Sequence, residues 1–301
     1  MNDAILRSFN PSVLVVISHY NAWKTDQLVA LLDQVASVPA GYPFQLRIVV
    51  NQAMPKPLEL PDRHIGSEIL YRENTGFNIG AWEHGWRTGP PYDIYLFLQE
   101  ECRIAQGGWL SPFVRLLQGG KVGLVGELLG WNSTWRFLKD YTGPYCQSWI
   151  TLDDGRRVDR ATFYMEFLER RGIPCGPKGD HLQSLILCAP RSVLEAIDGF
   201  SIGGSYHEAV ASEIAFSKKV QALGLQIKQI GTLPFTYIEH TQWSRAGRWQ
   251  LSPLVRARRM ARACLLSITP GFLKEQFDYF MMACGKCYMP PHNSASPEKR
   301  G

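Results

Sequence analysis

Short apolar runs alternate with segments that have apolar residues at helical spacing along the first 126 residues of the chain. The runs predict buried strands at 13–18, 45–50, 68–72, 94–98 and 122–126. Apolar residues at helical spacing predict helices around Leu28, Leu31, Leu32 and Val35, around Ile79, Trp82 and Trp86, and around Leu110, Phe113, Val114 and Leu117. Strands that alternate with helices predict an α/β fold with a doubly wound, mainly parallel sheet flanked by helices.

The pattern is less regular after residue 126. The region 127–180 is rich in aromatic residues and glycine, and it predicts one helix, at 158–171. Further elements are predicted as a strand at 184–189, a helix at 208–223 that ends at Gly224, and strands at 226–230 and 235–238.

The composition is that of a globular chain, with 301 residues of which 45% are hydrophobic. No apolar run approaches the roughly 20 residues of a transmembrane helix. Met1 to Asn10 lacks the layout of a signal peptide, so the expected compartment is the cytoplasm. The seven cysteines are an odd set, which argues against a disulfide framework. Cys284 and Cys287 have metal-like spacing, but only His292 lies near, so two ordinary thiols are the preferred interpretation.

Polar side chains follow three of the predicted strands. They are the segments Ser18-His-Tyr-Asn21, Asn51-Gln52 and Gln99-Glu-Glu101. Because the carboxyl ends of parallel strands meet at one edge of a sheet, these segments predict a ligand-binding crevice. The acids that follow Tyr95-Leu-Phe-Leu98 are typical of a site for a divalent cation beside a phosphorylated ligand.

The loop Glu73-Asn-Thr-Gly-Phe-Asn-Ile-Gly-Ala81 precedes the second predicted helix. Its two glycines permit a tight backbone near a ligand, and the helix start favours an anion. The spacing is not G-x-G-x-x-G, so a nicotinamide site has little support. Turn chemistry alone is the alternative for Asn74, Gly76 and Asn78.

The order of these features resembles the nucleotide-binding half of the family 2 glycosyltransferases. The resemblance continues through Pro190-Arg-Ser-Val-Leu194 and Asp198-Gly-Phe200 to a segment similar to the family's acidic catalytic motif, Ser212-Glu-Ile-Ala-Phe. Glu239-His-Thr-Gln-Trp-Ser244 is similar to the family's His and Ser motif. The likeness spans roughly residues 13–244, and the 74–81 loop resembles rhamnosyltransferase-like and rhamnan-synthesis relatives.

The resemblance implies a GT-A fold and assigns site residues by position. It places the catalytic base at Glu213 and the ligands of Mn²⁺ or Mg²⁺ at Glu101 and His240. It places the nucleotide-sugar site at His19, Tyr20, Asn21, Asn51, Asn74, Gly76, Asn78, Gly80, Gln99 and Glu100.

Three positions depart from the family pattern. Gln99 stands at the first acid of the usual Asp-x-Asp, which weakens or alters metal binding. Asn51 replaces the Asp that commonly reads the nucleoside, which leaves the identity of the base open. Ser212-Glu213 replaces Glu-Asp, so the base is one methylene longer.

The mechanism that the resemblance implies is a single displacement with inversion. Glu213 takes the proton of an acceptor hydroxyl on a glycan or a lipid-linked acceptor, and the setting is polysaccharide or glycolipid assembly. Glu208 and His207 are rival bases, and the irregular 127–180 region is expected to set specificity.

The positive charge is concentrated in one segment. The net charge is +5, and the segment Arg245 to Arg262 carries six arginines and no acid. It suits an amphipathic helix on an anionic membrane surface, which would make the protein peripheral on the inner face of the membrane. A solvated helix packed on the domain, or arginines that hold the diphosphate, are the alternatives. Without a recognised reading module, nucleic acid is not an expected partner.

The predicted domains are a GT-A domain at 10–245, a helical basic extension at 246–288 and a disordered tail at 289–301. Two other functions compete with transfer. A catalytically silent module that binds nucleotide sugars or glycans would keep the fold without turnover, as Gln99 hints. A metal-dependent nucleotidyltransferase would release pyrophosphate instead of a nucleoside diphosphate.

Overall fold

The computed structural model describes residues 10–64, 66–142, 149–152 and 154–243. The basic segment Arg245 to Arg262, the predicted extension 246–288, the predicted tail 289–301 and the pair Cys284 and Cys287 lie outside the described residues. Within those residues, no helix is long and apolar enough to cross a membrane.

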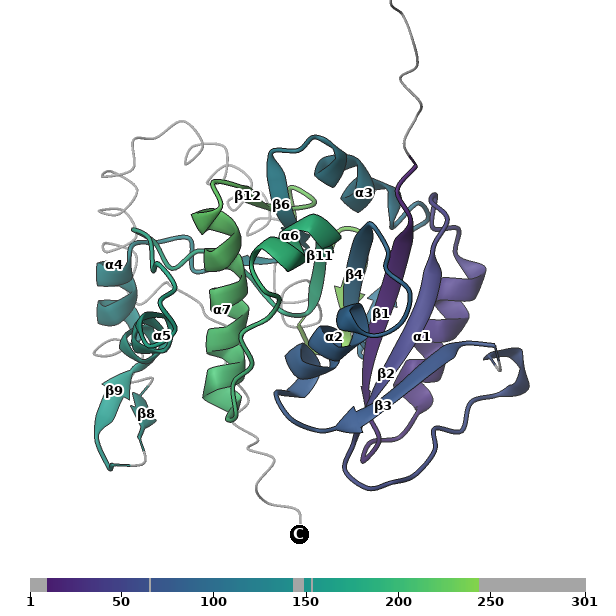
Figure 1. The fold of residues 1–301 in the computed structure, drawn as a ribbon, viewed down its shortest axis with the longest axis horizontal. Helices are drawn as coiled ribbons and strands as arrows, with labels where there is room; N and C mark the ends of the chain where they lie inside the picture. Colours follow the sequence, from purple (N-terminus) through teal and green to yellow (C-terminus); the bar gives the residue numbers. More distant parts are fainter. Residues whose placement is uncertain (1–9, 65, 143–148, 153, 244–301) are drawn as a thin grey trace, which may run out of the picture.

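A seven-stranded sheet forms the centre of the molecule (Figure 1). Its strands are β1 (Val13–Tyr20), β2 (Gln45–Gln52), β3 (Glu68–Glu73), β4 (Ile94–Gln99), β6 (Val122–Gly126), β11 (Ile186–Pro190) and β12 (Gln226–Gln229). The order is β12-β6-β11-β4-β1-β2-β3. Only β11 runs antiparallel to its neighbours in this sheet. The predicted α/β class with a doubly wound, mainly parallel sheet is therefore confirmed.

The reversed strand brings a late part of the chain to the edge where β1, β2 and β4 end. Ile186, at the start of β11, is paired with Leu98, near the end of β4. The residues just before β11 must therefore reach this edge from outside the sheet. This register is why Ser184 lies beside Gln99, whose side-chain amide donates a hydrogen bond to the Ser184 carbonyl.

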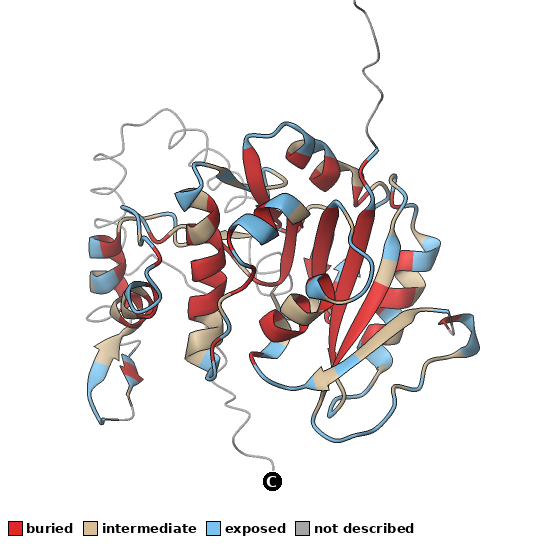
Figure 2. Ribbon diagram, viewed as in Figure 1, coloured by how far each residue is buried: buried red, intermediate tan, exposed pale blue. Residues whose placement is uncertain are grey.

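Helices cover both faces of the sheet. α1 (Asp26–Ser37) and α3 (Ser111–Gln118) pack on one face, and α2 (Phe77–Arg87), α6 (Arg191–Ala196) and α7 (Tyr206–Ala222) pack on the other. The first core lies between the sheet and α1 with α3, and the second core lies between the sheet and α2, α6 and α7. In β1, Val15 belongs to the first core and Val16 to the second, because successive side chains point to opposite faces. The central strands β1, β4 and β11 are consequently buried along almost their whole length (Figure 2).

α7 connects the sheet to a third, smaller core. Its Phe216 and Val220 pack in the second core, whereas Ala211 and Ile214 pack in the third. The rest of the third core comes from α4 (Trp135–Asp140), α5 (Arg160–Glu169), and the paired strands β8 (Trp149–Thr151) and β9 (Arg157–Asp159). We call residues 131–142, 149–152 and 154–173 the aromatic unit. α5 corresponds to the helix predicted at 158–171.

The described residues also form short strands outside the main sheet. They are β5 (Cys102–Ile104), β7 (Leu129–Gly130), β10 (His181–Leu182) and β13 (Ile238–His240), with one turn of 3₁₀ helix at Asp62–His64. β13 begins later than the strand predicted at 235–238. The buried Glu127 carboxylate accepts hydrogen bonds from the backbone N–H groups of Thr236, Tyr237 and Ile238, so the chain pairs with β5 only from Ile238 onward.

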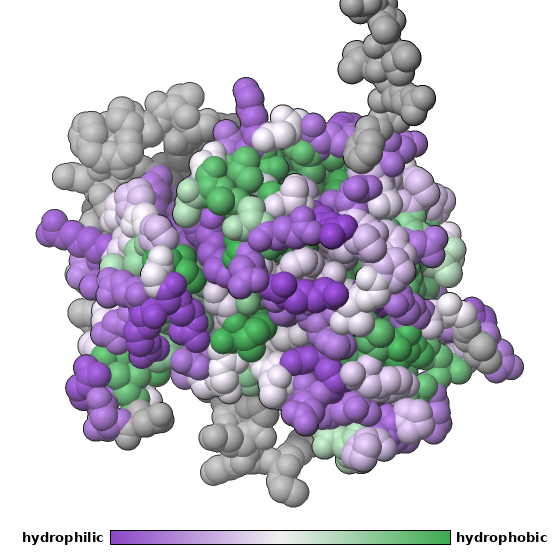
Figure 3. Space-filling model, viewed as in Figure 1, coloured by the Kyte–Doolittle hydropathy of each residue, from purple (hydrophilic) through white to green (hydrophobic). Residues whose placement is uncertain are grey.

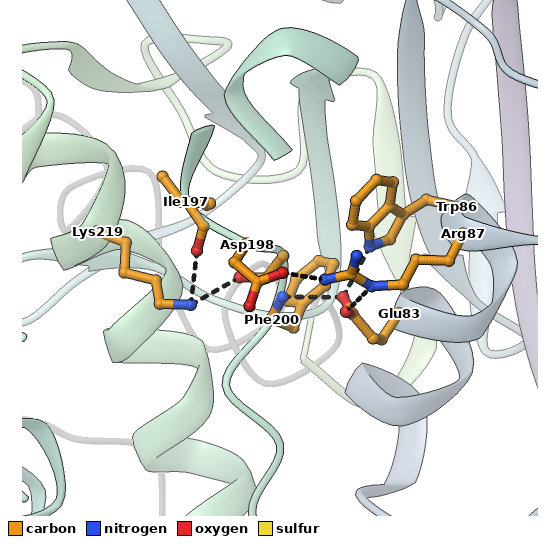
Figure 4. A network of polar contacts seen from close by, with 8 residues as sticks. Glu83, Trp86, Arg87, Ile197, Asp198, Phe200 and Lys219 are labelled. Atoms are coloured by element: carbon orange, nitrogen blue, oxygen red, sulfur yellow. Dashed lines mark hydrogen bonds and ion pairs between the residues drawn. The ribbon is translucent and has the colours of Figure 1, made fainter. Parts of the chain in front are cut away.

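A polar network joins α2, α7 and the segment that follows α6, on a face where hydrophilic side chains alternate with apolar patches (Figure 3). Its labelled members are Glu83, Trp86, Arg87, Ile197, Asp198, Phe200 and Lys219 (Figure 4). Glu83 accepts hydrogen bonds from Trp86 Nε1 at 2.7 Å and from the Phe200 backbone N–H at 2.9 Å. Lys219, on α7, donates to the backbone carbonyls of Ile197 and Gly199. The network therefore fixes α7 relative to α2.

Candidate active site

A cavity of about 730 Å³ lies at the edge where β1, β2 and β4 end. Its walls come from these strand ends, from the loop before α2, and from α7 with the aromatic unit. The predicted site residues that line it are His19, Tyr20, Asn51, Asn74, Asn78, Gln99, Glu100, Glu101, Glu213 and His240. Asn21, Gly76 and Gly80 do not line it.

The three predicted residues outside the cavity wall hold loops in place. Asn21 accepts a hydrogen bond from the Ala53 N–H at 2.7 Å and donates to the Met54 carbonyl at 2.8 Å. Gly76 precedes α2 with φ +71°, a conformation that favours glycine. A Cβ on Gly80 would lie 2.0 Å from the Thr75 carbonyl oxygen, so only glycine fits there.

Asn51 lines the cavity, but both ends of its amide are engaged. Its Oδ1 accepts a hydrogen bond from Arg72 at 2.6 Å, and its Nδ2 donates to the Phe77 carbonyl at 2.9 Å. Arg72 also donates to the carbonyl and hydroxyl oxygens of Thr75. This arrangement fixes the shape of the loop before α2 and holds the Asn51 amide in one orientation.

Glu100 forms a buried pair with His19 at the end of β1. Its Oε2 lies 2.6 Å from His19 Nδ1, and its Oε1 accepts a hydrogen bond from the Tyr20 N–H at 3.1 Å. His19 Nε2 is buried and has no hydrogen-bond partner among the described residues. Glu100 is thus occupied in holding the first loop, and its neighbour Glu101 is the carboxylate left for a ligand.

Glu101 is buried in the cavity wall, with no hydrogen bond or ion pair from its carboxylate to a described side chain. Burial raises the pKa of Glu101 to about 7, with a further contribution from the charge of Glu100. Its backbone carbonyl accepts a hydrogen bond from the Thr241 N–H at 3.0 Å. A carboxyl kept near neutrality on the edge of a cavity is typical of a functional group.

His240 reaches the same wall because β13 pairs with β5, which sets His240 opposite Cys102. Gln99 donates to the Ser184 carbonyl at 2.6 Å, so its Oε1 is the acceptor for His240 Nε2 at 3.1 Å. Burial lowers the pKa of His240 to about 4, so the imidazole is neutral. With the hydrogen on Nε2, the lone pair belongs to Nδ1. Gln99 thus orients His240 as an outer partner orients a metal-binding histidine.

Glu101 and His240 can serve as ligands of a divalent cation that takes its remaining ligands from phosphate and water. No group of three or more His, Cys, Asp or Glu side chains in the described part of the chain is placed to hold a metal ion. Mg²⁺ commonly needs only one or two carboxylates when phosphates and water supply its other ligands. Glu101 and His240 match that case, and they do not match a site built from protein ligands alone.

Glu213, on α7, is held by three hydrogen-bonding groups. Its Oε2 accepts from the Ser184 N–H at 2.7 Å and from the Ser184 hydroxyl at 2.6 Å. Its Oε1 lies 3.0 Å from His181 Nε2. His181 Nδ1 must carry a hydrogen, because it lies 2.9 Å from the Gly179 carbonyl, which can only accept. His181 and Glu213 therefore share one further proton.

Ser184 and His181 were not predicted from the sequence, and they join the parts of the site. The Ser184 carbonyl accepts hydrogen bonds from Asn78 at 2.8 Å and from Gln99, so Ser184 connects α2, β4 and α7. The only sequence signal was the position of Ser184 at the start of a predicted strand. That strand was expected to begin at 184, but it begins at Ile186.

The rival bases differ in position. Glu208 does not line the cavity; its Oε2 accepts a hydrogen bond from the Gly204 N–H at 2.8 Å. His207 does line it, and burial and then the charge of Arg160 lower the pKa of His207. Glu213 is the acid on α7 that faces the cavity with a defined set of donors.

Aromatic side chains form the wall opposite the strand ends. Trp131, Tyr141 and Tyr164 come from the aromatic unit, and Tyr206 and His207 begin α7. Trp131 lies edge-on to His181, with ring centroids 6.0 Å apart. Such rings offer apolar faces and polar edges together, which suits a sugar ring.

Comparisons with known proteins give only distant likenesses. No protein-family model matches the chain, and no curated protein sequence does. The solved structure of mannosyltransferase PcManGT from Pyrobaculum calidifontis, in complex with GDP-Man and Mn²⁺, has 14% sequence identity and a TM-score of 0.45, covering 94% of this chain and 78% of that chain.

Two further solved structures are similar at the same level. S. aureus TarS 1–349 has 11% identity and a TM-score of 0.41, covering 69% of this chain and 56% of that chain. GalNAc-T7 with UDP, GalNAc and Mn²⁺ has 12% identity and a TM-score of 0.42, covering 68% of this chain and 40% of that chain. The chain therefore spans about half of the TarS fragment and less of GalNAc-T7. Similarity this low assigns neither a family nor an activity.

Proposed function

We propose that this chain is a GT-A-type glycosyltransferase that moves a sugar from a nucleotide sugar to a hydroxyl of a glycan or lipid-linked acceptor, with inversion. The observation that carries the proposal is a single cavity in which two of the lining carboxylates, Glu101 and Glu213, differ in character. Glu101 has no side-chain partner, whereas Glu213 is held by Ser184 and His181. Environments that separate two carboxyl groups in this way suit separate chemical roles.

The donor side of the cavity is formed by the strand ends and the loop before α2. Ligands of open α/β sheets bind at such an edge, and the first turn of α2 offers backbone N–H groups to an anion. His19, Tyr20, Asn74 and Asn78 line this side. We assign the nucleotide and its diphosphate to it.

Glu101 and His240 are the residues that would hold a divalent cation, Mn²⁺ or Mg²⁺, on the donor side. When bound, the cation would neutralise charge that builds up on the departing diphosphate. Gln99 contributes by fixing the tautomer of His240, which gives a chemical role to the residue that departs from the family pattern.

Glu213 is the proposed general base. The acceptor oxygen forms a bond to the anomeric carbon from the face opposite the leaving group. The bond from the anomeric carbon to the diphosphate oxygen breaks, and its electron pair leaves with the nucleoside diphosphate. The hydroxyl proton passes to Glu213. Glu213 can accept it only as a carboxylate, so His181 must hold the shared proton when the acceptor binds.

The first test is donor binding by the full chain. Thermal unfolding is measured with UDP, GDP, dTDP, CDP and ADP, each with and without Mn²⁺ or Mg²⁺. A ligand that binds only the native state raises the melting temperature. We expect one nucleotide to raise it in a metal-dependent way, with the metal dependence lost in Glu101→Gln and kept in Glu169→Gln, an exposed acid at the end of α5.

The second test is turnover of the nucleotide sugar so identified. Glu213→Gln should lower the release of nucleoside diphosphate by about 10²–10⁴-fold, the range of general base catalysis, with nucleotide binding retained. Release of pyrophosphate would indicate a nucleotidyltransferase. Nucleotide binding without turnover, even with a broad set of glycan acceptors, would favour the silent binding module.

A further inference from the structure

Arg160 is a cation on the cavity wall that the proposed transfer does not use. Its side chain is half-buried, and its Nε is buried without a hydrogen-bond partner among the described residues. No described carboxylate forms an ion pair with it. Arg115 and Arg136, which also have no such partner in the described chain, are exposed to water. Of these three arginines, Arg160 therefore differs in that it has no carboxylate partner and is also partly removed from water.

Two acids that belong to the same wall or helix as Arg160 are engaged elsewhere. Asp159 caps α5, accepting hydrogen bonds from the Thr162 N–H at 2.8 Å and the Thr162 hydroxyl at 2.6 Å. Glu213 is close enough for its charge to act on Tyr164, but its oxygens face Ser184 and His181. A guanidinium drawn partly out of water without an anion costs free energy, so a ligand anion would complete this wall.

The groups around Arg160 suit a sugar that bears an anion. Tyr164, Tyr206 and His207 line the cavity beside it. The charge of Arg160 acts on both Tyr164 and His207, which shows that they lie near it. The lowered pKa of His207 leaves that imidazole neutral, so His207 does not compete for the anion. The fork of N–H donors on arginine matches a carboxylate or a phosphate.

Position distinguishes the acceptor from the donor diphosphate. Arg160 belongs to α5, and α7 lies between α5 and α2 (Figure 1). Ser184 is bound to Asn78 of α2 and to Gln99 of β4, whereas Arg160 and Tyr164 belong to α5. An anion at Arg160 therefore sits on the α5 side of the cavity, whereas α2 and the strand ends form the proposed nucleotide site.

We propose that Arg160 binds an anionic group of the acceptor, the carboxylate of an acidic sugar or a phosphate, and so holds the acceptor hydroxyl near Glu213. This inference rests on the proposed function, because it takes the ligand of this wall to be the acceptor. It narrows the acceptor class to anionic glycans or phosphorylated carriers.

Binding of small probes to the full chain tests the assignment. Isothermal titration calorimetry compares methyl β-D-glucuronide and glycerol phosphate with neutral methyl β-D-glucoside. We expect the wild-type chain to bind at least one anionic probe about tenfold or more tightly than the neutral probe. Arg160→Gln should abolish this preference, and Arg160→Lys should keep part of it. Arg136→Gln, which removes an exposed arginine from α4 of the same unit, should keep all of it.

The outcomes separate the two hypotheses. Preference for the glucuronide or for glycerol phosphate identifies the source of the anion. The inference is overturned if the wild-type chain shows no preference for an anionic probe, or if the preference survives in Arg160→Gln. It is also overturned if Arg160→Gln loses affinity for the nucleoside diphosphate while its affinity for the anionic probe is unchanged. If the anionic probe binds through Arg160 but no nucleotide binds, the proposed function fails while the anion site stands. Circular dichroism checks that each variant is folded. If Arg160→Gln does not fold, the probe preference of Arg160→Lys is compared with that of the wild-type chain instead.

Discussion

The proton shared by His181 and Glu213 makes the histidine a positioning residue whose removal has a specific signature. In His181→Leu, the buried Glu213 carboxylate keeps only its Ser184 donors. We expect turnover to fall roughly 10–100-fold, because Glu213 loses one of the three groups that hold it in place. His181→Gln, which can still donate, should be affected less. Nucleotide affinity serves as the control and should not change.

A loss of turnover in His181→Gln as large as that in His181→Leu would contradict this role for the hydrogen bond between His181 and Glu213. It would mean that His181 only supports the packing against Trp131.

Glu101 should make the stability of the free protein depend on pH. Its pKa of about 7 in the folded chain lies above its ordinary value of 4.5, so the folded state binds more protons between these values. The free energy of unfolding therefore falls as pH rises through this window, by roughly 3 kcal/mol. Glu101→Gln has no such titration and should gain about that much relative to the wild-type chain at pH 8, with little difference at pH 4.

Urea denaturation in the presence of a chelator measures the effect, with Glu169→Gln as the exposed control. Parallel pH dependences for the wild-type chain and Glu101→Gln would show that the Glu101 carboxyl is hydrated in the folded protein.

Among the site residues, those that follow apolar strands were accessible from the sequence. Glu101 and His19 stand directly after strand patterns, and parallel strands end at one edge, so their meeting was predictable. His181, Ser184 and Arg160 were not predicted, because their roles depend on hydrogen bonds, or on missing partners, between distant segments. The commitment of Asn51 to Arg72 and Phe77 likewise could not be inferred from residue type alone.

At the scale of elements, the Glu83 network should govern how firmly α7 is held. Glu83→Ala leaves the Trp86 indole N–H and the Phe200 backbone N–H without their acceptor, which costs about 1–3 kcal/mol of unfolding free energy. Phe200 stacks on Phe216 of α7 with ring centroids 4.1 Å apart, so turnover should fall as well. Urea denaturation and the turnover assay measure the two effects.

Glu195→Ala is the matched control, because it removes an exposed i,i+4 ion pair with Arg191 on α6. That change should cost no more than about 0.5 kcal/mol. Equal losses in the two variants would show that Glu83 contributes no more than a surface pair.

Element order was more predictable than strand direction. Apolar runs and helical stripes located every strand of the main sheet to within a few residues, and the signal is strongest for the inner strands, whose side chains are buried on both faces. The antiparallel direction of β11 could not be predicted from the apolar pattern, because a buried strand is apolar in either direction. The late start of β13 has a similar origin, because Glu127, distant in sequence, binds the preceding backbone.

At the scale of the whole molecule, the donor and acceptor sides should be separable, because they rest on different cores. The third core contains no residue of the seven-stranded sheet, and α7 remains held by the second core through Phe216 and Val220. Phe167 is fully buried in the third core, and Phe167→Ala should cost about 3–5 kcal/mol. We expect this cost to loosen the aromatic unit while the sheet and the strand ends persist.

Phe167→Ala should therefore keep the metal-dependent thermal shift with the nucleotide but lose transfer to the acceptor and the preference for anionic probes. The matched variant is Phe113→Ala, which removes an equally buried ring of α3, in the core that supports β1 and β4. That change should weaken nucleotide binding because it disturbs the sheet itself. If both variants lose nucleotide binding to the same extent, the cavity depends on one cooperative structure, and α7 does not separate its two sides.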